Sequence, residues 1–376
     1  MNLPGKPVCR ITALLNRSIS KEVTEALRAA GVVDLHVIPG RSPVMEQKRG
    51  GWFFFTRGSM AEDPVDILFF IIDAEMEIPA LHLIADKGIL HFPGRGSVFS
   101  EEVHLALAHE LCQENRASLL KSDKPLHLAE RLAVVCCIVQ RGQGESIGRV
   151  SLESGISVPS IHFGIGTGVR DKMGLLRITI PAEKEIVYAL ASSYDTGLLL
   201  DRMIEVGKLD QPGKGFIYEL PLSRGLINMK VMRGDQRRAA SIEQIVAALD
   251  QLKGGSEWRR RSASLGKRGF KKKRNYFSQM VDFSLLCDSG TGVDLVKTAM
   301  SAGAAGATIT KVKHLRPPDS PLSQIPHARE ACSMVVSENQ VSPLLDALQK
   351  AGAFTDSCHG QVQLRRVSRA FTYSPK

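Results

Sequence analysis

The sequence predicts an α+β fold built from three similar units. A stretch of fourteen residues occurs three times, at Ser18–Gly31, Gly142–Gly155 and Gly290–Gly303, each time after a short apolar run. Each copy ends in a glycine and precedes a second β-like run, which is the pattern of a strand, a helix capped by glycine, and another strand. Only the closing glycine is identical in all three copies, so the repeat depends on pattern more than on identity. Three copies predict a pseudo-threefold molecule with clefts where the copies meet.

Further apolar runs extend each copy to the order β-α-β-β-α-β. In the first unit, residues 8–103, the later elements are strands at 33–41, 66–74 and 96–103 and a helix at 77–90. The second unit, residues 131–232, has strands at 131–140, 160–168, 185–193 and 215–222 and a second helix at 195–209. The third unit, residues 282–374, has strands at 283–288, 307–315, 329–338 and 361–371 and a second helix at 341–354.

Units with this order form a four-stranded antiparallel sheet with two helices on one face, the ferredoxin-like arrangement. Runs such as 66–74 are apolar without clean alternation, so the second face of the sheet must also be buried. Three sheets packed face-inward around an axis would cover one another within a single monomeric chain.

Two connectors separate the units. Residues 104–130 follow the first unit and have helical periodicity over 104–122, so we expect a helical connector. Residues 233–280 contain a predicted helix followed by a basic run interrupted by glycine and serine. Within the first unit, residues 41–64 form a long excursion that contains the aromatic run Trp52–Phe55, either a hairpin extension or a loop tip that offers aromatic groups to a partner.

Composition indicates a soluble globular protein, with 43% hydrophobic and 23% charged residues. No apolar run reaches the roughly 18–20 residues that cross a bilayer, and the N-terminus lacks an apolar signal core, so we expect a cytoplasmic protein. The seven cysteines show no metal-binding spacing and fall largely in predicted strands, which favours buried free thiols.

The net charge of +10 comes from one segment. Residues 259–274 hold nine basic and no acidic side chains, and without them 40 basic residues face 39 acidic ones. A run of this composition predicts an exposed linker, so we expect no specific nucleic-acid partner.

Glycine-rich turns supply the candidate binding residues. A turn before the last strand contains Gly213, Lys214 and Gly215 in the second unit and Gly94, Arg95 and Gly96 in the first. The third unit has Gly360 there and no lysine or arginine. A further stretch, Gly166, Thr167 and Gly168, lies at the base of the loop between the second and third strands. Such turns let backbone N–H groups approach phosphate oxygens, and a lysine or arginine adds positive charge.

These residues and the element order resemble the PII signal-transduction family over nearly all three units. The family consists of trimeric ferredoxin-like sensors that bind adenine nucleotides between subunits and regulate a target through a flexible T-loop. The resemblance implies ATP, ADP or AMP as an effector and a target protein such as a membrane transporter or a metabolic enzyme. It is strongest in the second unit, so it favours the Gly213–Gly215 turn as the nucleotide site, with Lys214 neutralising phosphate. It implies no required cofactor and no metal.

The sequence offers no catalytic constellation. His36, His162 and His314 lie in or beside the second strands, where a structural role is expected, and GIGTG lacks the parallel β-α-β setting of a dinucleotide fingerprint. We therefore expect a regulatory protein and not an enzyme. Two alternatives stay open, namely a protein that associates with nucleic acid or a membrane surface through 259–274, and a ligand-free structural pseudo-trimer.

Overall fold

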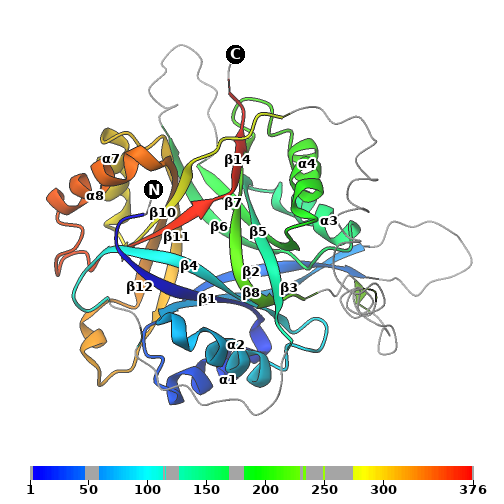
Figure 1. Cartoon of the computed structure of the whole chain (residues 1–376), viewed down its shortest axis with the longest axis horizontal. Helices are drawn as coiled ribbons and strands as arrows, with labels where there is room; N and C mark the ends of the chain where they lie inside the picture. Colours follow the sequence, from blue (N-terminus) through cyan, green and yellow to red (C-terminus); the bar gives the residue numbers. More distant parts are fainter. Residues whose placement is uncertain are drawn as a thin grey trace, which may run out of the picture.

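In the part of the chain that this computed structural model describes, fourteen strands join into one sheet, and helices cover it from outside (Figure 1). The structure describes residues 3–46, 59–112, 115, 127–168, 182–228, 232–233, 249 and 274–374. Figure 1 shows the helices in three pairs at the periphery (α1 with α2, α3 with α4, α7 with α8) and the strands at the centre. The predicted α+β class is confirmed.

The element order β-α-β-β-α-β occurs three times, and we call the three runs repeats 1, 2 and 3. Repeat 1 consists of β1 (Lys6–Asn16), α1 (Arg17–Ala29), β2 (Leu35–Glu46), β3 (Ser59–Ile72), α2 (Glu77–Lys87) and β4 (Gly96–Ala108). Repeat 2 consists of β5 (Ala129–Gln140), α3 (Gly144–Glu153), β6 (Ser160–Gly168), β7 (Glu183–Ser192), α4 (Thr196–Gly207) and β8 (Gly215–Leu226), and β9 (Met232–Arg233) follows it. Repeat 3 consists of β10 (Met280–Asp288), α7 (Gly292–Ser301), β11 (Gly306–Leu315), β12 (Ala328–Ser337), α8 (Val341–Lys350) and β13 (Gln361–Val367), followed by β14 (Arg369–Thr372).

The first helix of each repeat ends as the glycine pattern predicts. Gly31, Gly155 and Gly303 follow α1, α3 and α7 with φ of +89°, +65° and +115°. Residues with a Cβ rarely adopt this conformation, which lets the chain leave the helix and enter the next strand. All three copies therefore end in glycine because the backbone at this position has a positive φ.

Within every repeat the strands lie side by side in the order fourth, first, third, second, and all these pairings are antiparallel. Across repeats, the second strands β2, β6 and β11 pair with one another. The last strands also pair in a cycle, since β13 pairs with the end of β4, the end of β8 pairs with the start of β4, and β14 pairs with the start of β8. Each repeat is thus hydrogen-bonded to both others.

Apolar side chains are buried on both faces of the sheet. Each helix pair packs on its own sheet over a separate cluster of buried aliphatic side chains. A fourth cluster lies on the opposite face of the strands and draws on all three repeats, with Phe99, Tyr218 and Leu286 among its members. Burial of both faces explains why runs such as 66–74 lack polar alternation.

Several predicted boundaries were wrong. β4 continues to Ala108, so residues 104–108 of the expected helical connector are strand, because they pair with repeat 3. β2 extends to Glu46 and β3 begins at Ser59, which shortens the expected excursion at 41–64. The predicted strand 361–371 is divided into β13 and β14, which pair with different repeats.

The basic run 259–274 lies outside the described residues except for Arg274, which is not part of an exposed linker. Its Nη1 donates to Asp201 Oδ1 at 2.9 Å, and only 8% of its side chain is exposed. Tyr276 donates to the same carboxylate oxygen at 3.0 Å. The predicted helix in 233–280, apart from the isolated Leu249, and the aromatic run Trp52–Phe55 also lie outside the described residues.

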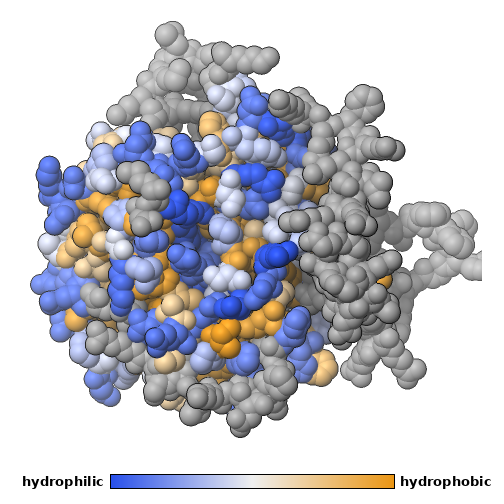
Figure 2. Space-filling view, in the orientation of Figure 1, coloured by the Kyte–Doolittle hydropathy of each residue, from blue (hydrophilic) through white to orange (hydrophobic). Residues whose placement is uncertain are grey.

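The cysteine prediction is confirmed, because all seven cysteines are free and buried. Among the described helices, none has the length and apolar content that a membrane span requires. On the face drawn in Figure 2, hydrophilic side chains cover much of the surface and apolar ones show between them. Large apolar side chains with high exposure are spread over all three repeats, at Ile78, Ile89, Phe92, Phe163, Ile165, Leu198, Val206, Phe277 and Val293. Such scattering is ordinary for a folded surface.

Candidate functional site

The two predicted glycine-rich turns begin the last strands of repeats 1 and 2 and have the same backbone conformation. Gly94 and Gly96 have φ of +84° and +149°, and Gly213 and Gly215 have +73° and +150°. A Cβ on Gly96 would lie 2.3 Å from Leu14 O, and one on Gly215 would lie equally close, 2.3 Å, to the carbonyl oxygen of β5 that it faces. Both turns thus require glycine for packing against the first strand of the repeat.

The turn of repeat 1 lines a cleft that opens toward repeat 2. The cleft has about 420 Å³ of empty space when its open mouth is included, of which the centres of water-sized molecules can reach about 30 Å³. Its walls are Leu14, Asn16, Ser42, Val44, Asp63, Val65, Gly94, Arg95, Gly96, Ser97, Val158 and Asn228. Most of any ligand would therefore lie in the open mouth, between the ends of β1, β2, β3 and β4 and two residues of repeat 2.

Asn228 connects repeat 2 to this turn. Gly94 N donates to Asn228 Oδ1 at 3.0 Å, and Asn228 N donates to Ser97 Oγ at 2.8 Å. Arg95 Nε donates to Gly88 O at 3.0 Å, which holds the guanidinium beside the turn. The cleft thus combines a glycine turn, an arginine and amide groups from two repeats.

The turn of repeat 2 has a different neighbour. Gly215 O accepts a hydrogen bond from Thr372 Oγ1 at 2.8 Å, because β14 runs beside the start of β8. Gln140 Nε2 donates to Gly213 O at 3.2 Å, and Lys214 is half-buried. The C-terminal strand therefore contacts the turn where the sequence favoured phosphate binding.

The third predicted stretch lies at the end of the second strand of repeat 2, in agreement with the predicted strand 160–168. Gly166, Thr167 and Gly168 are the last residues of β6, and they pair with Gly306–Thr308 at the start of β11. Their conformation is fixed by this antiparallel pairing between repeats 2 and 3.

Strand register identifies equivalent positions in the three repeats. Asn16, Gln140 and Asp288 end the first strands and lie opposite Val65, Lys184 and Arg329 of the third strands. Counting along the paired strands makes Ser42, Gly166 and His314 equivalent. The same counting matches Val158 with Asp34, Asn228 with His109, and Arg95 with His359.

The equivalent cleft between repeats 3 and 1 is therefore lined by charged groups and imidazoles. Arg329 Nη1 donates to Asp288 Oδ1 at 2.6 Å, and its Nη2 donates to His359 O at 2.7 Å. His359 Nδ1 lies 2.7 Å from Asp288 Oδ2, and His109 Nε2 lies 2.9 Å from Asp356 Oδ1. These groups stand at positions equivalent to those that line the cleft between repeats 1 and 2.

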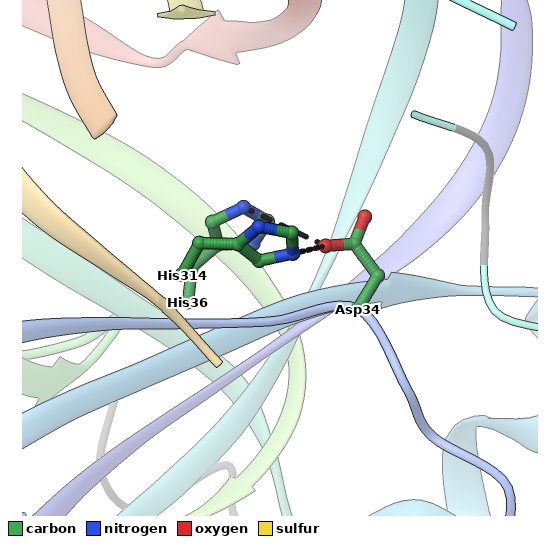
Figure 3. Close-up of side chains that lie close together, drawn as sticks. All are labelled: Asp34, His36 and His314. Atoms are coloured by element: carbon green, nitrogen blue, oxygen red, sulfur yellow. Dashed lines mark ion pairs between the residues drawn. The ribbon is translucent and has the colours of Figure 1, made fainter. Parts of the chain in front are cut away.

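A second cluster lies beside this network, where β2 and β11 pair at His36 and His314. Figure 3 shows both imidazoles directed at the carboxylate of Asp34. Asp34 Oδ1 lies 2.8 Å from His314 Nε2 and 3.6 Å from His36 Nε2, and the two rings stack with centroids 4.9 Å apart. Yet Asp34 Oδ1 and both ring nitrogens of His314 have no hydrogen bond of acceptable geometry, although all three residues are buried.

Burial controls the protonation of this cluster. It lowers the pKa of His36 to about 3, although Asp34 acts in the opposite direction. Burial alone would raise the pKa of Asp34, but the interactions with His36 and His314 outweigh it, and the pKa is lowered. At neutral pH, an ionised carboxylate therefore faces a neutral His36 imidazole in a water-poor environment.

A cavity of about 40 Å³ lies among the three sheets and has room for a few water molecules. Arg10, Arg365, His162, Tyr188 and Gln363 are among its lining residues. Arg10 Nη1 donates to Gln363 Oε1 at 2.9 Å, and its guanidinium lies over the Phe69 ring. With its open mouth included, this cavity has about 600 Å³ of empty space, which is more than the cleft beside the Gly94–Gly96 turn, but no glycine-rich turn lines it.

Comparison with protein-family models and with curated proteins gives no match for this chain.

Sequence reasoning missed the clusters between repeats 1 and 3. Asp34, His36 and His314 are far apart in the sequence, and only the pairing of β2 with β11 brings them together. The available signal was that His36 and His314 both lie on second strands. In repeat 3, His359 occupies the position that Arg95 and Lys214 occupy in the other two turns. The sequence pattern did not identify it as the polar group of this turn.

Proposed function

We propose that this chain is a PII-like regulatory protein, made of three fused ferredoxin-like units that pack as a pseudo-threefold monomer. The shared strand order of the three repeats and the cyclic pairing of their last strands support this proposal. The chain acts by binding an effector and contacting a target, such as a membrane transporter or a metabolic enzyme, and not by catalysis. It acts in the cytoplasm.

The effector is an adenine nucleotide, and its site is the cleft between repeats 1 and 2. One observation carries this assignment, namely that the Gly94–Gly96 turn, the base of the β2–β3 hairpin and Asn228 of repeat 2 line one solvent-open space. In the related turn of repeat 2, β14 contacts Gly215. At the equivalent positions between repeats 3 and 1, Arg329 and Asp288 are paired with each other.

The chemistry of the cleft fits a phosphorylated ligand. The two glycines keep Cβ atoms out of the turn, Gly94 N is already bonded to Asn228 Oδ1, and Arg95 supplies a cation that can donate to phosphate. Val44 and Val158 offer apolar contacts for a base, and Ser42 and Asn16 offer polar ones for a ribose. The nucleotide would thereby bridge two repeats.

Titration calorimetry of the full chain with ATP, ADP and AMP tests this function. We expect saturable binding of at least one nucleotide and a loss of affinity of about 10-fold or more in Arg95→Ala, because a charge-assisted contact contributes about 1.5–3 kcal/mol. Lys214→Ala is the matched control at the equivalent turn and should bind like the parent. Absence of saturable binding would favour the ligand-free pseudo-trimer.

A converse result is equally informative. If Lys214→Ala weakens binding and Arg95→Ala does not, the effector site lies at the turn of repeat 2, as the sequence alone favoured. The function would stand, and the cleft assignment would be wrong.

A further inference from the structure

The cluster of Asp34, His36 and His314 contains an unsatisfied arrangement of ligand-type atoms. One carboxylate oxygen and two imidazole nitrogens lie within 4.8 Å of one another, and all three residues are buried. Asp34 Oδ1 and His314 Nε2 lie 2.8 Å apart as an ion pair but form no hydrogen bond of acceptable geometry, and His314 Nδ1 has no hydrogen-bond partner. Buried polar atoms are normally satisfied, so such a group calls for an explanation.

We propose that Asp34, His36 and His314 bind one divalent transition-metal ion, with zinc as the best-suited species. Two imidazoles and one carboxylate are ligands that zinc accepts in a tetrahedral site, with a water molecule in the fourth position. Zinc bonds these atoms at roughly 2.0–2.2 Å, so binding draws the two rings slightly toward a shared centre.

The surroundings hold the ligands in place. Asn115 Oδ1 accepts hydrogen bonds from Val33 N and Asp34 N, both at 2.9 Å, and Asn115 Nδ2 donates to Asp34 O at 3.2 Å. The His36 ring stacks on Phe69 with centroids 5.2 Å apart. Supporting contacts of this kind orient metal ligands and tune their affinity.

The local charge also permits a cation. Arg329 influences Asp34 electrostatically, but its guanidinium is paired with Asp288 at 2.6 Å. The ion would balance the buried carboxylate of Asp34.

Such a site would add a metal bridge to two repeats that already share strand pairing, buried ion pairs and an apolar cluster. Asp34 and His36 belong to repeat 1, and His314 belongs to repeat 3. The ion would lie between them, beside the pair of Arg329 with Asp288. This inference does not depend on nucleotide binding between repeats 1 and 2.

The test is the metal content of the full chain after incubation with zinc chloride and removal of free metal, and the visible spectrum after replacement by Co²⁺. We expect one equivalent of zinc, a cobalt spectrum of a tetrahedral site without thiolate ligands, and a higher melting temperature than in the chelator-treated chain. Asp34→Asn and His314→Gln should each lower the affinity by more than the 10–100-fold typical of losing an outer-shell partner.

His162→Gln is the matched control. His162 is also a buried histidine on a second strand with an unpartnered Nδ1, but its ring packs against Tyr188, and it is not part of the cluster. This variant should keep the metal. Circular dichroism checks that the variants are folded, and if a ligand variant unfolds, the zinc content and cobalt spectrum of the parent chain decide.

Three outcomes would overturn the proposal. The parent chain could hold no stoichiometric zinc, the cobalt spectrum could show thiolate ligands, or both ligand variants could retain the metal while folded.

Discussion

Arg365 of β13 and Glu101 of β4 form a buried, two-pronged ion pair between repeats 3 and 1. Arg365 Nη1 lies 3.0 Å from Glu101 Oε1 and 3.1 Å from Oε2, and Arg365 Nη2 contacts Asp282 Oδ2. Glu101 also lies 3.6 Å from Arg10 Nε. The apolar centre of the molecule therefore includes a charged network whose members belong to two repeats.

Removing one partner of this network should destabilise the chain strongly. Arg365→Met leaves Glu101 and Asp282 buried without their main counter-charge, so we expect a loss of about 3–5 kcal/mol in the free energy of unfolding. Arg149→Met removes an exposed pair with Glu145 on α3 and should cost about 0.3–0.5 kcal/mol. Urea denaturation measures both, and equal losses would contradict a structural role for the buried pair.

The turn glycines give a second comparison. Gly96→Ala places a Cβ 2.3 Å from Leu14 O at a φ of +149°, whereas Gly142→Ala has a positive φ of +86° but open space around the new atom. We expect Gly142→Ala to cost about 1 kcal/mol and Gly96→Ala at least twice as much. Thermal unfolding checks the order, and similar values would show that the turn relaxes freely.

Acid should weaken the fold through His162. Burial lowers the pKa of His162 from 6.5 to about 3, so between these values the unfolded chain binds the proton and the folded chain does not. Above pH 6.5 the buried imidazole therefore costs no stability. Between pH 6.5 and about 3 the free energy of unfolding falls by about 1.4 kcal/mol for each pH unit.

Urea denaturation between pH 7.5 and 5.0 measures this effect. In His162→Gln the loss of stability over that range should be smaller than in the parent by up to about 2 kcal/mol. His91→Gln, at an exposed residue, should leave the pH dependence unchanged. Identical profiles in the parent and His162→Gln would contradict the assignment.

Arg274 marks where the basic run meets the folded chain. Arg274→Ala removes contacts to Asp201 and Glu205 of α4, at 2.9 and 3.7 Å, and should lower the free energy of unfolding by about 1–3 kcal/mol.

Replacing residues 259–273 by a Gly/Ser linker should leave the melting temperature unchanged, because the sequence predicts an exposed linker there. A collapse in melting temperature after the linker replacement would refute the linker interpretation.

Local patterns in the sequence predicted local structure well. The helices, their closing glycines and the second strand 160–168 follow from periodicity and from the need for positive φ at Gly31, Gly155 and Gly303. The errors lie where one repeat meets another. Residues 104–108 and β14 are strand because a neighbouring repeat supplies the partner, and no local periodicity reports that pairing.

The candidate site was predictable in its parts but not in its position. The sequence identified the turns at Gly94–Gly96 and Gly213–Gly215, and both exist as equivalent structures. Which cleft stays open depends on Asn228, on Thr372 and on the pair Asp288–Arg329, all of which act across repeats. Such contacts depend on register between distant strands.

A crystal structure of the full chain grown with ATP tests the central claim most directly. The account predicts nucleotide density between repeats 1 and 2, with phosphates against Gly94–Gly96 and the remainder near Asn228, and no nucleotide between repeats 3 and 1. Nucleotide at the Gly213–Gly215 turn alone, or none at concentrations that saturate binding in solution, would contradict it.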